Sequence, residues 1–317
     1  MSAPPPLAWV VGAGGLVGRH VAAELAAAGH ELMTSRVPWD DEAEAVDVLA
    51  AEAARFAEAR AGRDWVLVWC AGAGVVATGE DALAAEGRVF AAALDRVAAG
   101  VGTEEEGVLF LASSAGGLYA GSSEPPFTED SEPRPLVPYG RVKLAMEERL
   151  RTVVAATGMR AVVGRLANVF GPGQRLGKPQ GLLSQLCLAD ATGSPLPVFV
   201  SMDTIRDYVH VGDAAKMVRR CVELVRDEPR GTTVVKVIAS GTPVTVGHLV
   251  GEARRVFHRP LRTISVAGGR GQVHDLRMRS VRWPEVDALA STTLAAGLAD
   301  TAADVRARVA TGGALDA

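Results

Sequence analysis

The first two thirds of the chain alternate short apolar runs with longer stretches in which apolar residues recur at helical spacing. The apolar runs at residues 7–11, 65–71, 108–111 and 160–164 have the length and composition of strands buried in a parallel sheet. The stretch 81–99 carries apolar residues three and four positions apart, which predicts an amphipathic helix. This alternation predicts an α/β fold built on a Rossmann-type, doubly wound parallel sheet.

The alternation loosens after residue 172, where a stretch rich in Gly, Pro and Leu predicts an inserted helix with loops. We therefore predict a dinucleotide-binding Rossmann domain over residues 1–172, to which 207–239 return. Residues 173–206 and 240–317 should form a smaller mixed substrate-binding domain. Ligands of open α/β sheets bind at the carboxyl ends of the strands, so we expect substrate in the cleft between the two domains.

The first apolar run is followed at once by a glycine-rich turn and a helical stretch. Gly12, Gly15 and Gly18 fit the pattern Gly-x-x-Gly-x-x-Gly, and Leu16 and Val17 open the helix. Such a turn lets the backbone approach a pyrophosphate, and the helix N-terminus offers N–H donors and partial positive charge. A tight turn without a ligand is the alternative, but the placement between strand and helix favours a dinucleotide.

The end of the second predicted strand, residues 30–35, bears on the choice of cofactor. An acidic side chain there would bind the adenosine ribose hydroxyls, whereas Arg36 could clamp a 2′-phosphate. Arg36 therefore leans toward NADP over NAD, although a plain surface arginine is an equally good interpretation of this residue alone.

We also predict that two further pairs of residues contact the cofactor. Asp47 and Val48 lie near the start of the polar, helix-favouring stretch 40–61, and Ala71 and Gly72 end the third predicted strand. Glycine at that end allows backbone to pass close to a ligand.

Tyr139 and Lys143 are the candidate acid/base groups. Four positions apart on a helix, they share one face about one turn apart. A free phenol, with a pKa of about 10, is a poor acid or base at neutral pH, but a nearby ammonium favours the phenolate and lowers that value. Chance spacing on a solvated helix is the alternative, and for this pair taken alone it is the more common case. The neighbouring motifs reverse that balance.

Ser113 and Ser114 end the fourth predicted strand, where ligands bind in open α/β sheets. Their alternative role is to cap a turn or helix.

Composition excludes several other classes of protein. A net charge of −4 and a pI near 5.9 leave no basic footprint for nucleic acid. Cys70, Cys187 and Cys221 are odd in number and lack metal-ligand spacing, which indicates buried thiols of a reducing compartment and no metal site. The start of the chain resembles neither a signal peptide nor a membrane span, so the expected location is cytoplasmic.

Taken together, these motifs identify a family. The chain resembles the extended short-chain dehydrogenases/reductases, in the nucleotide-sugar epimerase/dehydratase/reductase branch. The resemblance covers nearly the whole length and rests on five blocks in the family's order and spacing: the glycine turn, residues 113–119, Tyr139 with Lys143, residues 165–174 and residues 206–213.

The resemblance implies the following roles. Tyr139 is the general acid/base, Lys143 assists it and holds the nicotinamide ribose, and Ser114 polarises the reacting carbinol or carbonyl. Ser113 is the reserve for the last role, because the family's usual hydroxyl position falls on Ala115. The residues that resemble contacts to the sugar and diphosphate of the substrate are Asn168, Arg206 and Arg270. Family members are usually homodimers, through the helix that contains Tyr139 and the helix at 81–99.

The chemistry can be narrowed by the residues at 115–117, which are Ala, Gly and Gly. The family's dehydratases and decarboxylases carry acidic residues there, so both activities are disfavoured. Hydride exchange at one sugar carbon remains, either by an NADPH-dependent 4-ketoreductase, which Arg36 favours, or by a 4-epimerase with retained NAD. Weaker alternatives are a non-catalytic dinucleotide-binding sensor and an enzyme of the same family that acts on a ketone outside the nucleotide sugars.

Overall fold

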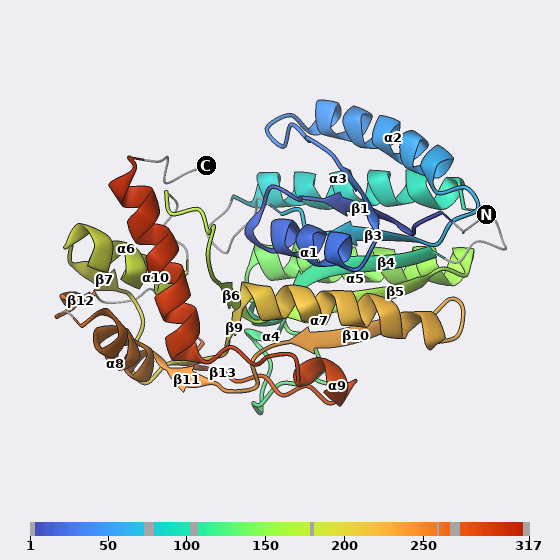
Figure 1. The fold of residues 1–317 in the computed structure, drawn as a ribbon. Coiled ribbons are helices and arrows are strands. Elements are labelled where there is room, and N and C mark those ends of the chain that lie inside the picture. The colour runs from blue at the N-terminus through green and yellow to red at the C-terminus, as the bar shows by residue number, and fades with distance from the viewer. Residues whose placement is uncertain are drawn as a thin grey trace. The chain divides into compact units, whose positions relative to one another are not determined.

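The fold was analysed in a computed structural model that describes residues 4–72, 79–101, 107–177, 181–258, 260–266 and 273–312. The chain divides into two compact units (Figure 1). The first comprises residues 1–122, 131–166 and 215–237, and the second comprises 123–130, 167–214 and 238–317.

The first unit contains a six-stranded sheet with helices on both faces. Its elements are β1 (Leu7–Val11), α1 (Leu16–Ala27), β2 (Glu31–Thr34), α2 (Glu42–Ala59), β3 (Trp65–Trp69), α3 (Glu80–Ala99), β4 (Gly107–Ser114), α4 (Ala115–Tyr119), α5 (Pro138–Thr157), β5 (Arg160–Leu166), α7 (Val211–Leu224, whose first residues are counted with the second unit), a 3-10 turn (Val225–Asp227) and β10 (Thr233–Ile238). The strand order is β10-β5-β4-β3-β1-β2, and β1 to β5 pair in parallel.

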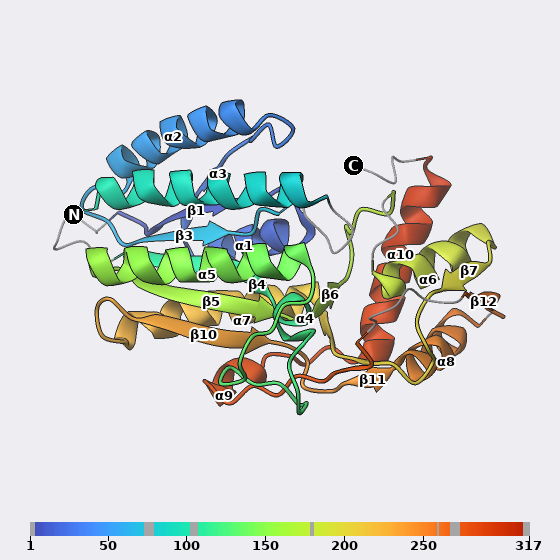
Figure 2. The same ribbon diagram turned by 180° about the vertical axis from the view of Figure 1, so that it is seen from behind.

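The sheet is apolar on both sides because helices cover both faces. Every residue of β1 and β3 is buried, as continuous apolar runs of a parallel sheet require. Helices α3 and α5 pack together on one face with α2 beside α3, and α1 and α7 lie on the other (Figures 1 and 2). Trp9, Phe56, Trp65 and Trp69 belong to the resulting core.

The order of the strands reverses between β1 and β3. β1 pairs with β2 on one side and β3 on the other, so the connections leave these neighbours in opposite directions. Such a reversal opens a crevice at the carboxyl ends of the strands. The chain segments at that edge are the glycine turn after β1 and the residues that follow β3 at Cys70.

The second unit mixes helices with short strands. Its elements are β6 (Asn168–Phe170), α6 (Leu182–Thr192), β7 (Leu196–Val198), β8 (Ile205–Arg206), β9 (Tyr208–His210), β11 (Val244–Thr245), α8 (Val246–Phe257), β12 (Thr263–Ser265), β13 (Asp275–Leu276), α9 (Pro284–Asp287) and α10 (Leu294–Ala310). The pairs are β11-β8-β13, β12-β7 and β6-β9. Apolar side chains of α6, α8 and α10 form its core.

The boundaries of the two units differ from the predicted domains in four segments. Residues 123–130, 167–172, 207–214 and 238–239, placed with the Rossmann domain from the sequence, fall in the second unit. The reason is local pairing: β6 lies parallel to β9, and Phe127 forms a bridge with Met278. These pairings cannot be anticipated from spacing alone.

Candidate active site

The glycine turn after β1 is compact because Gly12 and Gly18 lack a side chain. Gly12 has a φ of 89°, and a Cβ there would lie 2.5 Å from the backbone nitrogen of Ala71. A Cβ on Gly18 would lie 2.2 Å from the carbonyl oxygen of Gly12. Nothing lies within 4 Å of a Cβ built on Gly14. The turn is therefore closed on the sheet side and open at Gly14, as a pyrophosphate cradle requires.

The N-terminus of α1 is well suited to an anion. Gly15 is the N-cap residue and offers no side-chain cap, and the first turn, which includes Leu16 and Val17, holds no acidic residue. Arg19 folds back over the turn and donates to the carbonyl oxygens of Gly14 and Gly15, each at 3.2 Å. Free backbone N–H groups and an added guanidinium both favour a bound phosphate. These residues fit a dinucleotide.

The end of β2 carries charges of both signs. Ser35 accepts a hydrogen bond from Trp9 Nε1 at 2.9 Å and donates to Glu52 Oε2 at 3.2 Å. Arg36 follows and is exposed, and no described residue forms a hydrogen bond or ion pair with it. The structure thus places a carboxylate from α2 beside the residue that precedes Arg36. Sequence reasoning missed Glu52 because it lies 17 positions away.

Asp47 and Val48 lie in the second turn of α2, with Asp47 exposed. The buried face of this helix is formed by Ala45, Leu49 and Ala53, so neither candidate residue belongs to it. Ala71 lies against Gly12, and Gly72 follows it at the carboxyl end of β3. Their assignment to the cofactor stays a prediction.

Tyr139 and Lys143 lie in the first turns of α5, which starts at Pro138, where a missing N–H has no cost. Lys143 Nζ is 5.8 Å from the centroid of the Tyr139 ring. The lysine is only 4% exposed, whereas Tyr139 is partly exposed. The ammonium is thus held inside the protein, on the face of α5 that also carries the partly exposed phenol.

Lys143 is paired with a carboxylate that the sequence did not indicate. Its Nζ donates to Glu86 Oε1 of α3 at 2.8 Å, and the two side chains are 5% and 6% exposed. Burial acts to lower the pKa of Lys143, but the Glu86 carboxylate and then Tyr139 outweigh it, so the pKa lies above its usual value. The neighbouring Cys70 thiol has its pKa raised to about 12 by burial, which Lys143 partly opposes.

The two candidate serines face different surroundings. Ser114 is the N-cap of α4, and its hydroxyl accepts from Gly117 N at 3.1 Å. A Cβ on Gly117 would lie 3.0 Å from the Tyr139 ring and 3.3 Å from Ser114 Oγ. The Ser114 hydroxyl and the Tyr139 ring are therefore both next to Gly117. Ser113 is 5% exposed and donates to Glu147 at 2.6 Å. This geometry favours Ser114 as the hydroxyl that works with Tyr139.

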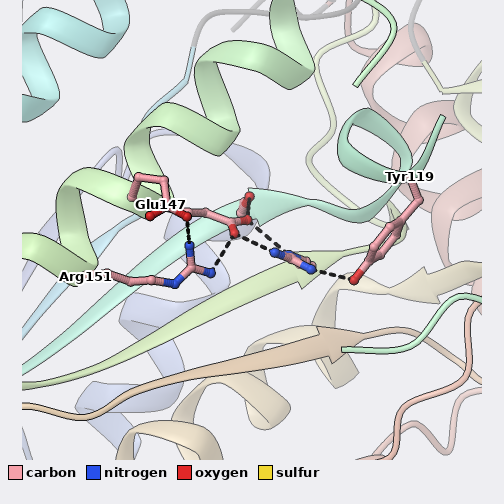
Figure 3. A network of polar contacts seen from close by, with 6 residues as sticks. Tyr119, Glu147 and Arg151 are labelled. Carbon is pink, nitrogen blue, oxygen red and sulfur yellow. Dashed lines mark hydrogen bonds and ion pairs between the residues drawn. The ribbon is translucent and has the colours of Figure 1, made fainter. Parts of the chain in front are cut away.

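A buried polar network centres on Glu147, one turn after Lys143 along α5 (Figure 3). The Glu147 carboxylate, which is fully buried, accepts from Ser113, from Arg165 Nε and Nη2 at 3.2 and 2.8 Å, and from Arg151 at 3.2 Å. Arg165 also donates to the hydroxyl of Tyr119 at 2.6 Å. The network therefore ties α4, which carries Tyr119, to α5 and to strands β4 and β5.

The predicted substrate contacts belong to the second unit. Asn168 donates through its side-chain amide to the carbonyl oxygen of Asp207 at 2.8 Å. The Arg206 guanidinium donates to the carbonyl oxygens of Ile205 and Val273, both at 2.7 Å, and burial lowers its pKa. Arg270 lies outside the described residues. The roles of all three stay predictions.

Two absences can be stated for the described part of the chain. No cluster of three or more His, Cys, Asp or Glu side chains there is arranged to hold a metal ion. No helix there is both long enough and apolar enough to cross a membrane.

Comparison with known proteins supports the family suggested by the motifs. The model of the NAD dependent epimerase/dehydratase family matches residues 8–237. The dTDP-4-dehydro-6-deoxyglucose reductase of Escherichia coli is 28% identical over 142 residues, which cover 45% of this chain and 43% of that protein. A UDP-glucose 4-epimerase of Rhizobium leguminosarum bv. trifolii is 30% identical over 180 residues, covering 53% and 54%. The chain spans about half the length of the curated relatives it matches.

Solved structures match over almost the whole chain. The UDP-glucose 4-epimerase of Thermotoga maritima, with UDP-glucose, has a TM-score of 0.79 at 18% identity and covers 96% of this chain and 99% of that one. The corresponding enzyme of Stenotrophomonas maltophila, with bound NAD and formylated UDP-arabinopyranose, has a TM-score of 0.76 at 19% identity, with 96% and 99% covered. These likenesses confirm the predicted fold class.

Proposed function

The chain belongs to the NAD dependent epimerase/dehydratase family, and from this premise we propose that it transfers a hydride at one carbon of a nucleotide-activated sugar, as an NADPH-dependent 4-ketoreductase. The observation that carries the proposal is the convergence of Tyr139, Lys143 and Ser114 at the carboxyl edge of the sheet. When bound, the nicotinamide cofactor supplies the hydride.

In this proposal each of the three site residues has one role. Tyr139 donates a proton to the carbonyl oxygen as the hydride arrives, and Ser114 donates a hydrogen bond to the same oxygen. Lys143 stabilises the phenolate that remains on Tyr139. The chain has no acidic residue at 115–117, so loss of water next to a transient ketone is not part of the proposed reaction.

The cofactor preference depends on the two charges at the end of β2. Arg36 is exposed and without a described partner, so its guanidinium is available to a 2′-phosphate. Glu52 lies beside Ser35 and would accept from ribose hydroxyls but repel a phosphate. We propose that Arg36 prevails, because Glu52 already pairs with Arg55 at 2.6 Å.

The second candidate function is a 4-epimerase with retained NAD. The Glu52 carboxylate favours it, since a carboxylate at this strand end is the usual ligand of an unphosphorylated adenosine ribose. A 4-epimerase needs the same acid/base pair, because it removes and then returns a hydride at the same carbon.

Cofactor identity and retention distinguish the two functions. The purified protein is denatured and the supernatant assayed for nucleotide, and the apo form is titrated with NADPH and NADH by fluorescence. Stoichiometric release of NAD with weak NADPH binding would overturn the reductase and favour the epimerase. An empty protein that prefers NADPH supports the ketoreductase, and 4-keto nucleotide sugars are then the substrates to screen.

A pair of arginine variants makes the cofactor test specific. Arg36→Ala should weaken NADPH binding about 10-fold or more and leave NADH binding nearly unchanged, because one charge-assisted contact to phosphate is lost. Arg96→Ala is the matched control, since Arg96 is also exposed but lies in the last turn of α3. Equal weakening of both nucleotides by Arg36→Ala would contradict the assignment.

The partners follow from the same reasoning. A nucleotide sugar is the proposed substrate, and Asn168 and Arg206 are proposed to contact it, with the Arg206 guanidinium on the diphosphate. We also propose a homodimer formed through α3 and α5, and a cytoplasmic location. Sedimentation of the purified chain tests the dimer.

A further inference from the structure

The ion pair between Lys143 and Glu86 lies inside the helix pair α3 and α5. The two helices pack closely, and a Cβ on Gly87 would come within 3.4 Å of Val142. Glu86 extends from α3 toward α5, and its carboxylate meets the ammonium at 2.8 Å. A Cβ on Gly72 would lie 3.2 Å from both charged atoms, so the pair reaches the backbone at the carboxyl end of β3.

The groups around Lys143 leave Glu86 as its counter-charge. From its own helix, Tyr139 approaches by its ring and Met146 by its neutral sulfur at 4.0 Å. From the end of β3 comes Cys70, whose thiol stays neutral at physiological pH because burial raises its pKa to about 12. From α3 comes the Glu86 carboxylate. Around Tyr139 itself, α4 contributes Gly117 and Ser114, neither of them charged.

A buried ion pair is weak evidence that the pair serves only to stabilise the fold. Withdrawing both charges from water costs about as much as their attraction returns, and well-packed apolar residues of similar volume are often as stable. Helices α3 and α5 already pack through apolar residues such as Val142, so the carboxylate is not needed to hold them together. The Glu86 carboxylate lies 2.8 Å from the ammonium of the lysine assigned to Tyr139.

We propose that Glu86 is the negative end of an ion pair that tunes Tyr139: its carboxylate weakens the field of the Lys143 ammonium at the phenol and so limits how strongly that ammonium stabilises the phenolate. The proposal rests on the proposed function in so far as Tyr139 is the acid/base group. A lone cation would favour the phenolate strongly, whereas a cation paired at 2.8 Å acts on Tyr139 as one end of a dipole, whose field is weaker. Glu86 would thereby favour the neutral phenol, which is the form that can donate a proton to a carbonyl.

The test is a spectrophotometric titration of tyrosine in the full chain, which requires no turnover. The chain has three tyrosines, so the phenolate signals can be separated. Burial raises the pKa of Tyr208 to about 12, and Tyr119 is fully buried with its hydroxyl bound to Arg165. The transition that disappears in Tyr139→Phe is assigned to Tyr139.

The expected order of midpoints is specific. Glu86→Gln should lower the midpoint of the Tyr139 transition by about one pH unit, the size of effect that one nearby charge has at an effective dielectric constant of about 20. Lys143→Gln should raise it. Glu86→Asp keeps the charge and should restore a midpoint near that of the unmodified chain. If the ketoreductase is active, Glu86→Gln should move the alkaline limb of its pH–rate profile down by the same amount.

Two outcomes would overturn the proposal: an unchanged midpoint in folded Glu86→Gln, or a midpoint that rises. Because this variant leaves a buried lysine unpaired, it could unfold, and circular dichroism checks for that. If it does unfold, the single variant Lys143→Gln is compared with the double variant that also carries Glu86→Gln. The double variant should have the lower Tyr139 midpoint, and equal midpoints would refute the proposal. A midpoint that shifts as expected in a protein without reductase or epimerase activity would refute the proposed function and leave the role of Glu86 standing.

Discussion

Replacing Glu147 by Gln should cost the first unit a large part of its stability. The Glu147 carboxylate is fully buried and accepts from four donors, three of them on arginines. An amide has a single acceptor oxygen, so at best two of the four contacts remain, and its NH₂ group faces the donors. Two lost hydrogen bonds to charged groups cost about 1.5 kcal/mol each, or about 3 kcal/mol together. The Arg165 charge left buried without a counter-ion brings the expected loss to about 3–5 kcal/mol.

The free energy of unfolding is measured by urea denaturation, followed by far-ultraviolet circular dichroism. The adjacent Glu148→Gln is the matched control, because Glu148 is 65% exposed and pairs with the same Arg151. It should cost no more than about 0.5 kcal/mol, as exposed ion pairs do.

A double replacement distinguishes the effect of the buried charges on stability from the effect of the volume that their side chains fill. Glu147→Leu combined with Arg165→Met removes both buried charges, so it should be more stable than Glu147→Gln alone. The reasoning fails if Glu147→Gln costs as little as Glu148→Gln, or if the double replacement is the less stable of the two.

Three further outcomes are expected elsewhere in the chain. Gly18→Ala should abolish cofactor binding or folding, because its Cβ would lie 2.2 Å from the carbonyl oxygen of Gly12. Gly14→Ala should keep the melting temperature of the unmodified chain and only weaken the binding of NAD(P), as measured by fluorescence titration. Burial raises the pKa of Asp207, so its protonated form is favoured in the folded state; the free energy of unfolding should fall as pH rises through that raised pKa, and Asp207→Asn should remove this dependence in urea titrations at a series of pH values. Arg206→Ala should raise the Michaelis constant for a nucleotide sugar far more than it lowers turnover, in steady-state assays of both parameters, if the guanidinium binds the diphosphate. An equal loss in the two parameters would contradict that role.

The regular part of the fold could be predicted because its determinants are local. Buried parallel strands appear as continuous apolar runs, and the observed β1 (Leu7–Val11) has the predicted bounds. The family named from the motifs is confirmed by the family model over residues 8–237. The short helix α4 was not predicted, because five residues that contain two glycines carry no periodic signal.

The partners of the site residues could not be predicted, because they come from distant parts of the chain. Glu86 precedes Lys143 by 57 positions, and Glu52 follows Ser35 by 17. Neither carboxylate lies in a motif, and each occupies a helix whose other residues have ordinary helical spacing. Only the packing of those helices brings the two carboxylates to Lys143 and Ser35. Their contacts are therefore visible in the structure and not in the sequence.

One signal in the sequence could have been carried further. The spacing that identified Tyr139 and Lys143 continues through Glu147 to Arg151, so four residues at intervals of four form one row along α5. The residues of the row have different partners. The partly exposed phenol comes first, the buried ammonium paired with α3 follows, and the next residue is the carboxylate that contacts β4 through Ser113 and β5 through Arg165. A helix that presents charges of alternating sign toward a buried sheet must find a partner for each of them, because an unpaired buried charge costs several kcal/mol. The row alone therefore predicts buried partners on neighbouring elements, and a search for isolated acidic residues on the adjacent helix would have given two candidates, Glu86 and Asp95.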